Sequence, residues 1–160
     1  MANELKPIKR SEQLVPLSKD HHDGLLLVWK IKQGLKNGTA LTDIATYVNW
    51  FWQQHLHDHF QQEEQFLAPN LPQDNPMLLQ MLDEHQEIKA LIHINEQIGD
   101  EALLIQFADL LNNHIRFEER QLFPFAENYI PQDKLNTIHT ELITEKKECP
   151  KWENEFWLKK

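Results

Sequence analysis

The sequence predicts an all-α fold: an antiparallel up-down-up-down four-helix bundle with a short C-terminal helical extension. Only 4 of the 160 residues are glycine, and no stretch shows the apolar-polar alternation of a β-strand. Apolar residues recur instead at every third or fourth place, as they do on one face of a helix. Short segments rich in proline, asparagine and glycine separate four long amphipathic stretches, so neighbouring helices are expected to run antiparallel.

Helix-ending and helix-starting residues delimit the first two predicted helices. The first helix covers about residues 11–36 and ends at Asn37 and Gly38, where a left-handed cap is expected. The second begins near Thr42, as its N-cap, and must stop near the proline-containing loop at 69–72. Each helix is long enough to span the whole bundle.

The second half of the chain is delimited in the same way. Asn75 before a proline opens the third helix, and residues 99–100, a glycine and an aspartate, separate it from the fourth. Beyond Pro131 a shorter helical segment is predicted over about residues 132–147. These signals complete the four-helix pattern and leave one extension.

The chain is long enough for one domain with a sizeable core. We expect the bundle to occupy residues 11–130, with residues 131–160 forming a helical extension packed on the same domain. The aromatic tail, which contains Trp152 and Trp157, could cap the bundle or form a homodimer contact, and the sequence does not choose between them.

Composition restricts the partners and the cellular compartment. The formal charge of −9 argues against nucleic acid or an anionic membrane surface as a partner. No stretch approaches the roughly 18 consecutive apolar residues of a membrane span, and the N-terminus does not resemble a signal peptide. Cys149 is the only cysteine, which excludes an intramolecular disulfide and a cysteine zinc cluster. A cytoplasmic protein is therefore predicted.

One motif appears twice, as HFQQEEQFLAP from His59 and as HIRFEERQLFP from His114. In each copy a glutamate, Glu63 or Glu118, follows the histidine four residues later, so both side chains project from one helical face. This face is the apolar stripe of the helix. An ionised glutamate in a dry core is costly unless it is paired, protonated or bound to a metal. Two metal-coordinating units on two helices are therefore predicted.

The glutamate that follows each motif glutamate, Glu64 or Glu119, is turned away from the apolar stripe and is expected to be solvated. His55 lies one turn before the first motif histidine and on the same face. It could bind a metal directly, although hydrogen bonding from outside the ligand set is favoured.

The other two helices supply further histidines. His85 lies on the apolar stripe of the third helix, and His21 or His22 on that of the first; the register favours His21, and His22 stays open. Four imidazoles and two carboxylates exceed the four ligands of a closed zinc site and suit iron or manganese. Two shared glutamates would serve two metals about 3.5 to 4 Å apart, with an oxide or hydroxide as a further bridge. The candidate metal ligands are His21, His22, His59, Glu63, His85, His114 and Glu118.

This order of histidines and HxxxEE motifs over roughly residues 13–130 resembles the hemerythrin-like, or HHE cation-binding, family. The resemblance implies a four-helix bundle around a non-haem di-iron centre, with two iron ions joined by an oxo or hydroxo bridge. Oxygen-carrying hemerythrins have HxxxH in the third helix, whereas Met81 and Lys89 lie four residues before and after His85 here. Their fourth-helix carboxylate is an aspartate one residue later than Glu118. These departures disfavour reversible oxygen transport and resemble the bacterial branch, with its more reactive or sensory site.

The predicted function is binding of, or reaction with, a small oxidant or gas (dioxygen, nitric oxide or peroxide) at an open iron position. A di-metal enzyme that turns over peroxide or nitric oxide, or releases iron for repair, is the first alternative. A metal-stabilised structural bundle is the second. A Lewis-acid hydrolase has less support, because no further catalytic pair is visible in the sequence.

Overall fold

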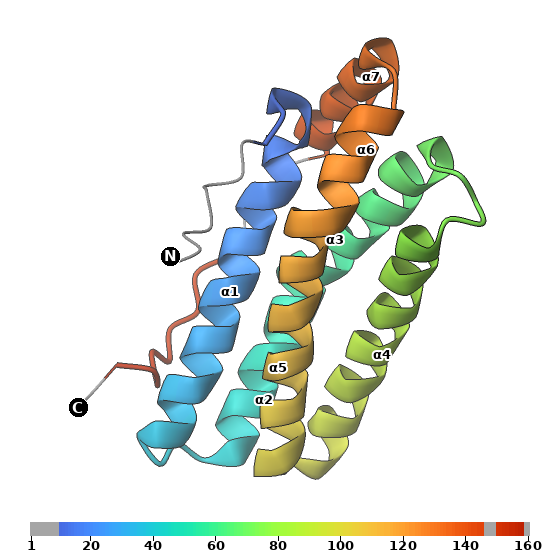
Figure 1. The fold of residues 1–160 in the computed structure, drawn as a ribbon. Coiled ribbons are helices and arrows are strands. Elements are labelled where there is room, and N and C mark those ends of the chain that lie inside the picture. The colour runs from blue at the N-terminus through green and yellow to red at the C-terminus, as the bar shows by residue number, and fades with distance from the viewer. Residues whose placement is uncertain (1–9, 146–149, 159–160) are drawn as a thin grey trace, which may run out of the picture.

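The computed structural model describes residues 10–145 and 150–158, so that Cys149 lies outside the described part. The described residues form helices and loops without a β-strand, which confirms the predicted all-α class. Long helical segments lie side by side and are joined by short turns (Figure 1). No helix in the described part is long and apolar enough to cross a membrane.

The first segment consists of a 3₁₀ turn, η1 (Glu12–Leu14), and the helix α1 (Val15–Lys36). It ends as predicted: the N–H of Asn37 donates to a carbonyl of the last turn, and Gly38 has a φ of 73°. That left-handed conformation favours glycine, which has no Cβ to clash with the backbone.

The second segment changes its helical type along its length. It begins at Leu41, one residue before the predicted N-cap Thr42, and the true N-cap, Ala40, provides no side-chain hydrogen bond. The prediction of Thr42 as N-cap is therefore wrong. The parts are α2 (Leu41–Phe51), the π-helical η2 (Trp52–Leu56), α3 (His57–Gln62), the π-helical η3 (Glu63–Leu67) and the 3₁₀ turn η4 (Ala68–Asn70).

The third and fourth segments begin with side-chain caps at the predicted places. The Asn75 side chain accepts hydrogen bonds from two N–H groups of the first turn of α4 (Pro76–Ile98), and Asp100 caps α5 (Glu101–Phe117). The fourth segment continues through the π-helical η5 (Glu118–Leu122) into α6 (Phe123–Tyr129).

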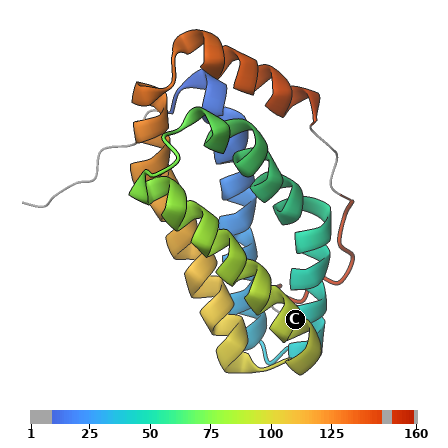
Figure 2. The ribbon, with the colours of Figure 1, turned by 90° about the vertical axis from the view of Figure 1, so that its right-hand side faces the viewer.

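Neighbouring segments pack along their lengths. In the contacts of the described residues, α1 packs against α2 and α5, and α4 packs against α2 and α5 (Figure 1). The last helix, α7 (Gln132–Thr144), lies across one end of the bundle and contacts η1, α1 and η3 (Figure 2). The C-terminal tail returns along the bundle, where the buried Phe156 ring packs against Gly34.

Two clusters of buried apolar residues fill the interior. One includes Leu27, Ile31 and Leu111, and the other, toward α7, includes Leu17 and Phe123. Along α1 the buried His21 falls between Leu17 and Leu27, and hence between the two clusters. His21 is therefore a buried polar residue at the level where the two apolar clusters meet.

Candidate metal centre

Six polar side chains from all four segments meet between the two apolar clusters. They are almost completely shielded from solvent: the two glutamates are 0% exposed and the four histidines between 1% and 3%. Such burial is exceptional for ionisable residues unless they are paired or bind a metal. The six are His21, His59, Glu63, His85, His114 and Glu118.

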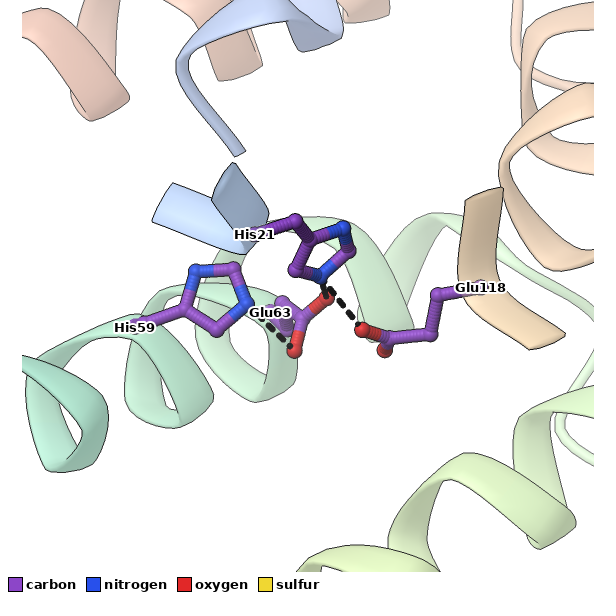
Figure 3. Close-up of side chains that lie close together, drawn as sticks. All are labelled: His21, His59, Glu63 and Glu118. Carbon is purple, nitrogen blue, oxygen red and sulfur yellow. Dashed lines mark hydrogen bonds and ion pairs between the residues drawn. The ribbon is translucent and has the colours of Figure 1, made fainter. Parts of the chain in front are cut away.

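The first pair of histidines faces both glutamates. The Nε2 atom of His21 lies 2.8 Å from Oε1 of Glu118 and 3.8 Å from Oε2 of Glu63. The Nε2 atom of His59 lies 3.3 Å from Oε1 of Glu63. Figure 3 shows these four side chains converging on one point from three segments.

The second pair repeats this arrangement. The Nε2 atom of His85 lies 3.1 Å from Oε1 of Glu63 and 3.9 Å from Oε2 of Glu118. The Nε2 atom of His114 lies 3.3 Å from Oε1 of Glu118. Both carboxylates therefore stand between the two imidazole pairs.

The six side chains divide into two groups of four potential metal ligands. One group contains His21 and His59 with both glutamates, and the other contains His85 and His114 with the same two glutamates. Within each group one ligand atom from every residue lies within 4.8 Å of the others. Two histidine pairs that share two carboxylates can hold two cations side by side.

The repeated motif also has a repeated backbone conformation. Glu63 and Glu118 are each the first residue of a five-residue π-helical segment, η3 or η5. In both copies a proline follows two residues after this segment, as Pro69 or Pro124. Proline cannot donate a backbone hydrogen bond and its ring displaces the carbonyl of the preceding turn, so it favours a widened turn there. π-Helical turns occur frequently at functional sites.

On its outer side, each imidazole of the first pair bonds a carboxylate from a neighbouring segment. The Nδ1 atom of His21 lies 2.9 Å from Oε1 of Glu119, and the Nδ1 atom of His59 lies 3.0 Å from Oδ2 of Asp20. Glu119 also accepts hydrogen bonds from Arg10 and Ser18.

The second pair has the same outer contacts. The Nδ1 atom of His85 lies 2.9 Å from Oε2 of Glu64, and the Nδ1 atom of His114 lies 2.8 Å from Oε1 of Glu84. The prediction that Glu64 and Glu119 are merely solvated is therefore wrong. Sequence reasoning did not identify Asp20 or Glu84 at all, although each directly precedes a buried histidine.

The outer carboxylates orient the imidazoles. An ionised carboxylate can only accept a hydrogen bond, so each Nδ1 donates. When the imidazole is neutral, the remaining lone pair is on Nε2 and points at the two glutamates. A histidine that binds a metal commonly has this arrangement, with its other ring nitrogen fixed by an acceptor.

Burial and charge act in opposite directions on these histidines. Burial alone would lower the pKa of His114, but the adjacent Glu118 and Glu84 raise it to about 10. Burial also opposes protonation of His59, but Glu63 and Asp20 hold its pKa well above the ordinary value. The Nε2 protons must leave before a metal can bind, so cations and protons compete for the same atoms.

The pKa of Glu118 is shifted downward, whereas the pKa values of the histidines are shifted upward. Burial would raise its pKa, but His114 and His21 hold it well below the ordinary value of 4.5. This carboxylate is therefore ionised at neutral pH, in a position that water does not reach. Its negative charge must therefore be balanced by protonated imidazoles around it or by a bound cation.

Orphaned polar atoms test whether these residues fit a metal. Among the described residues, eight buried side-chain nitrogen or oxygen atoms have no hydrogen-bond partner, and half of them belong to the convergent group: Nε2 of His59, Nε2 of His114, Oε2 of Glu63 and Oε2 of Glu118. Buried polar atoms nearly always have partners. Four unpartnered imidazole and carboxylate atoms that face one another form a donor set that fits divalent or trivalent transition-metal ions.

Two candidate histidines lie outside this group. His22 is exposed, whereas the adjacent His21 is buried within it. His55 is partly buried, and its Nε2 atom lies 3.7 Å from Oδ1 of Asp20 and 3.7 Å from Oδ2 of Asp23. It therefore stands beside an outer carboxylate of the centre, on the surface side.

Comparison with protein families gives one match. Residues 17–126, more than half of the chain, match the family model described as "Hemerythrin HHE cation binding domain". The match spans all six buried polar residues of the centre. The curated proteins and the solved structures give no significant match.

Proposed function

The chain belongs to the hemerythrin HHE cation-binding family, and from that premise we propose that it holds two iron ions and handles a small oxidant or gas. Its ligand for that reaction would be dioxygen, nitric oxide or peroxide. The observation that carries the proposal is the pair of four-residue groups that share two buried glutamates.

Each ion has its own histidine pair in this proposal. His21 and His59 would bind one ion, His85 and His114 the other, and Glu63 and Glu118 would serve both. The ligand role of His22 is not part of the proposal, because its side chain is exposed. Support for shared glutamates comes from their short distances to imidazoles of both pairs.

Iron is favoured by the chemistry of the donors. Imidazole nitrogens and carboxylate oxygens suit iron or manganese, whereas thiolates, the preferred ligands of zinc structural sites and copper(I), do not occur in the centre. Two carboxylates and four neutral imidazoles also provide fewer donors than two six-coordinate ions require. Positions for a small exogenous ligand would therefore stay open.

When bound, an iron pair supplies these open positions and exchanges electrons with the ligand. The protein supplies a dry environment. The Phe60 ring stacks on His85 with 3.9 Å between ring centroids, and Phe123 stacks on His21 at 5.2 Å. These rings shield the imidazoles and keep water away from the reacting position, which strengthens the electrostatic interactions inside it.

The antiparallel up-down-up-down order of the four segments belongs to the same proposal. The short turns at Gly38 and Gly99, and the packing of α1 against both α2 and α5, support it. The predicted division into a bundle over residues 11–130 and an extension over 131–160 stays a prediction, as does the cytoplasmic location.

Metal analysis of variants tests this assignment. Full-length protein is expected to contain two irons per chain, and Glu63→Gln and Glu118→Gln, made separately, should each lower that content. Glu141→Gln removes the same charge from an exposed position on α7 and should leave the content unchanged. Full iron content in either inner variant would count against that glutamate as a ligand.

Spectra and rapid mixing then test the chemistry. An oxo-bridged ferric pair absorbs in the near ultraviolet and visible, whereas zinc does not. Mixing the reduced protein with dioxygen, nitric oxide or peroxide should change this absorption. A stoichiometric change indicates binding, and repeated consumption of the ligand indicates turnover. Unchanged spectra with all three ligands would count against gas or oxidant handling.

A further inference from the structure

The outer hydrogen bonds of the centre form a closed ring around the bundle. His21 of α1 bonds Glu119 of η5, and His114 of α5 bonds Glu84 of α4. His85 of α4 bonds a carboxylate of η3, and His59 of α3 bonds a carboxylate of α1. Every segment thus gives one imidazole and one carboxylate, always in the same direction. We call Asp20, Glu64, Glu84 and Glu119 the outer carboxylate ring.

We propose that the outer carboxylate ring consists of positioning residues that favour trivalent over divalent metal ions in the centre, and so stabilise oxidised iron. The inference rests on the proposed function, because it assumes a pair of iron ions bound by the inner residues. It goes further by assigning the redox state that the surrounding charges select.

Charge balance is the first argument. The centre contains two inner carboxylates, and four outer ones contact its imidazoles. Arg10 offsets the charge of Glu119, which leaves five carboxylate charges, and a hydroxide or oxide bridge would raise the negative charge to six or seven. Two trivalent ions supply six positive charges and come close to this total, whereas two divalent ions supply only four. Excess charge in a poorly hydrated interior is costly, so the oxidised pair is favoured.

Partial exposure reduces the weight of each outer charge but does not remove it. The side-chain exposures are 18% for Glu84, 23% for Glu119, 27% for Asp20 and 38% for Glu64. Solvent screens the more exposed carboxylates more strongly. Judged by exposure alone, Glu84 should therefore contribute most to the preference for trivalent iron, and Glu64 should contribute least.

The hydrogen bond itself provides the second argument. A carboxylate that accepts from Nδ1 increases the basicity of Nε2 on the same ring. A more basic ligand stabilises the more highly charged ion more strongly. This contribution passes through the imidazole, at separations of 2.8 to 3.0 Å between Nδ1 and the carboxylate oxygen, and does not depend on long-range charge.

Glu84 offers the cleanest test. In the described part of the chain no hydrogen bond or salt bridge joins Glu84 to an arginine or lysine, whereas Glu119 bonds Arg10. Replacing Glu119 would leave a mostly buried guanidinium without this partner. Glu84→Gln removes the charge but keeps an oxygen that can accept from Nδ1 of His114. Glu87→Gln is the matched control, on the exposed side of the same helix.

The experiment measures the midpoint potential of iron-loaded full-length protein by spectroelectrochemical titration, together with its iron content. Glu84→Gln should keep two irons and shift the potential upward. A tenfold weaker hold on ferric relative to ferrous iron corresponds to about 59 mV for a one-electron step. Glu87→Gln should not shift it. Glu64→Gln should give a smaller upward shift and provides the test if Glu84→Gln does not fold.

The outcomes separate the two proposals. Wild-type protein that takes up no iron would overturn the proposed function and this inference with it. Wild-type protein with two irons, and a Glu84→Gln variant with two irons and an unchanged or lower potential, would overturn this inference alone. An equal shift in Glu87→Gln would show a general effect of surface charge and would also overturn it.

Discussion

The two halves of the centre have similar inner geometry but different surroundings. In each half a motif histidine lies 3.3 Å from its motif glutamate, and a second histidine from another segment approaches a glutamate more closely. Each of the four imidazoles also bonds an outer carboxylate. The halves differ in what lies behind these carboxylates.

Behind His21 stands a second layer of charge and aromatic packing. Arg10 donates to Glu119 and to Glu127, and its guanidinium lies 5.2 Å from the centroid of Phe123. The Phe123 ring in turn stacks on His21. Arg10 therefore supports this imidazole both through the carboxylate and through the aromatic ring.

Behind His85 and His114 the support is lighter. Glu64 is 38% exposed, and Glu84 accepts a hydrogen bond from the exposed Gln80. The repeated motif thus supplies one histidine, one inner glutamate and one outer glutamate to each half, whereas Arg10, which lies outside the repeat, supports only the side of His21. Four predictions test this comparison, in order of decreasing expected effect.

Alkaline pH should affect both halves of the metal-free protein together. The folded-state pKa of His114 is about 10, above the ordinary value of 6.5, so its stabilising contribution is complete below about pH 6.5 and is lost as the pH rises through 10. The lowered pKa of Glu118 gives the opposite pH dependence: its stabilising contribution is present above about pH 4.5 and is lost on acidification. Stability should therefore be greatest between these limits.

Urea unfolding from pH 4 to pH 10 measures this dependence. His59→Gln and His114→Gln, one in each half, should each reduce the alkaline loss by removing one raised pKa. Iron affinity should change in the opposite direction and increase with pH, because cations displace the Nε2 protons. Unfolding free energies that stay constant up to pH 10 would contradict the assigned ion pairs.

Removing one inner carboxylate should be the next largest effect. In metal-free protein, Glu118→Gln removes the fully buried carboxylate beside Nε2 of His21 and His114 and leaves these imidazoles only their outer partners. The loss of unfolding free energy should be about 3 kcal/mol, the lower end of the range for a broken buried ion pair. Glu63→Gln should cost a similar amount, because it stands in the same relation to His59 and His85. Chemical denaturation provides the measurement. Clearly unequal losses would show that the asymmetry extends to the inner residues.

Arg10→Gln should affect only the half that contains His21. The 8%-exposed guanidinium loses charged hydrogen bonds, so we expect a loss of about 1.5–3 kcal/mol. Lys32→Gln is the control: it breaks an exposed salt bridge to Asp109 and should cost about 0–1 kcal/mol. At limiting iron, the two proposed ion positions of Arg10→Gln should also fill less equally, because only the position beside His21 has lost its support. Equal losses of unfolding free energy in Arg10→Gln and Lys32→Gln would show that Arg10 does not support His21 more than an exposed salt bridge does.

His55→Gln should have the smallest effect. His55 lies beside Asp20 and outside both four-residue groups, so the iron content should stay at two per chain. Metal analysis and visible spectra are the measurements. Loss of one iron would instead identify His55 as a ligand, which the HxxxH spacing with His59 left open.

The helical class and the convergence of the six residues follow from local sequence rules. The signals at Gly38, Asn75 and Asp100 correctly placed three helix boundaries, because backbone conformation and side-chain caps act within a few residues. The family assignment was also correct. Heptad register favoured His21 over His22, and the structure buries His21 alone. The ligand role of these residues stays a prediction until a metal is measured.

Other features depend on contacts between distant parts of the chain. The expected solvation of Glu64 and Glu119 considered only their own helix, whereas their partners are His85 on α4 and His21 on α1. Arg10 reaches carboxylates more than one hundred residues away. The π-helical turns were missed because the usual helical period assumes a constant number of residues per turn.

The direction of the outer hydrogen bonds has a consequence for fragments. Within the first half of the chain, His59 finds its carboxylate but the partner of His21 is absent; within the second half, His114 finds its carboxylate but the partner of His85 is absent. Neither helical hairpin alone contains an outer carboxylate partner for both of its buried histidines. Mixing the two separately produced hairpins should therefore restore, by complementation, contacts that each lacks.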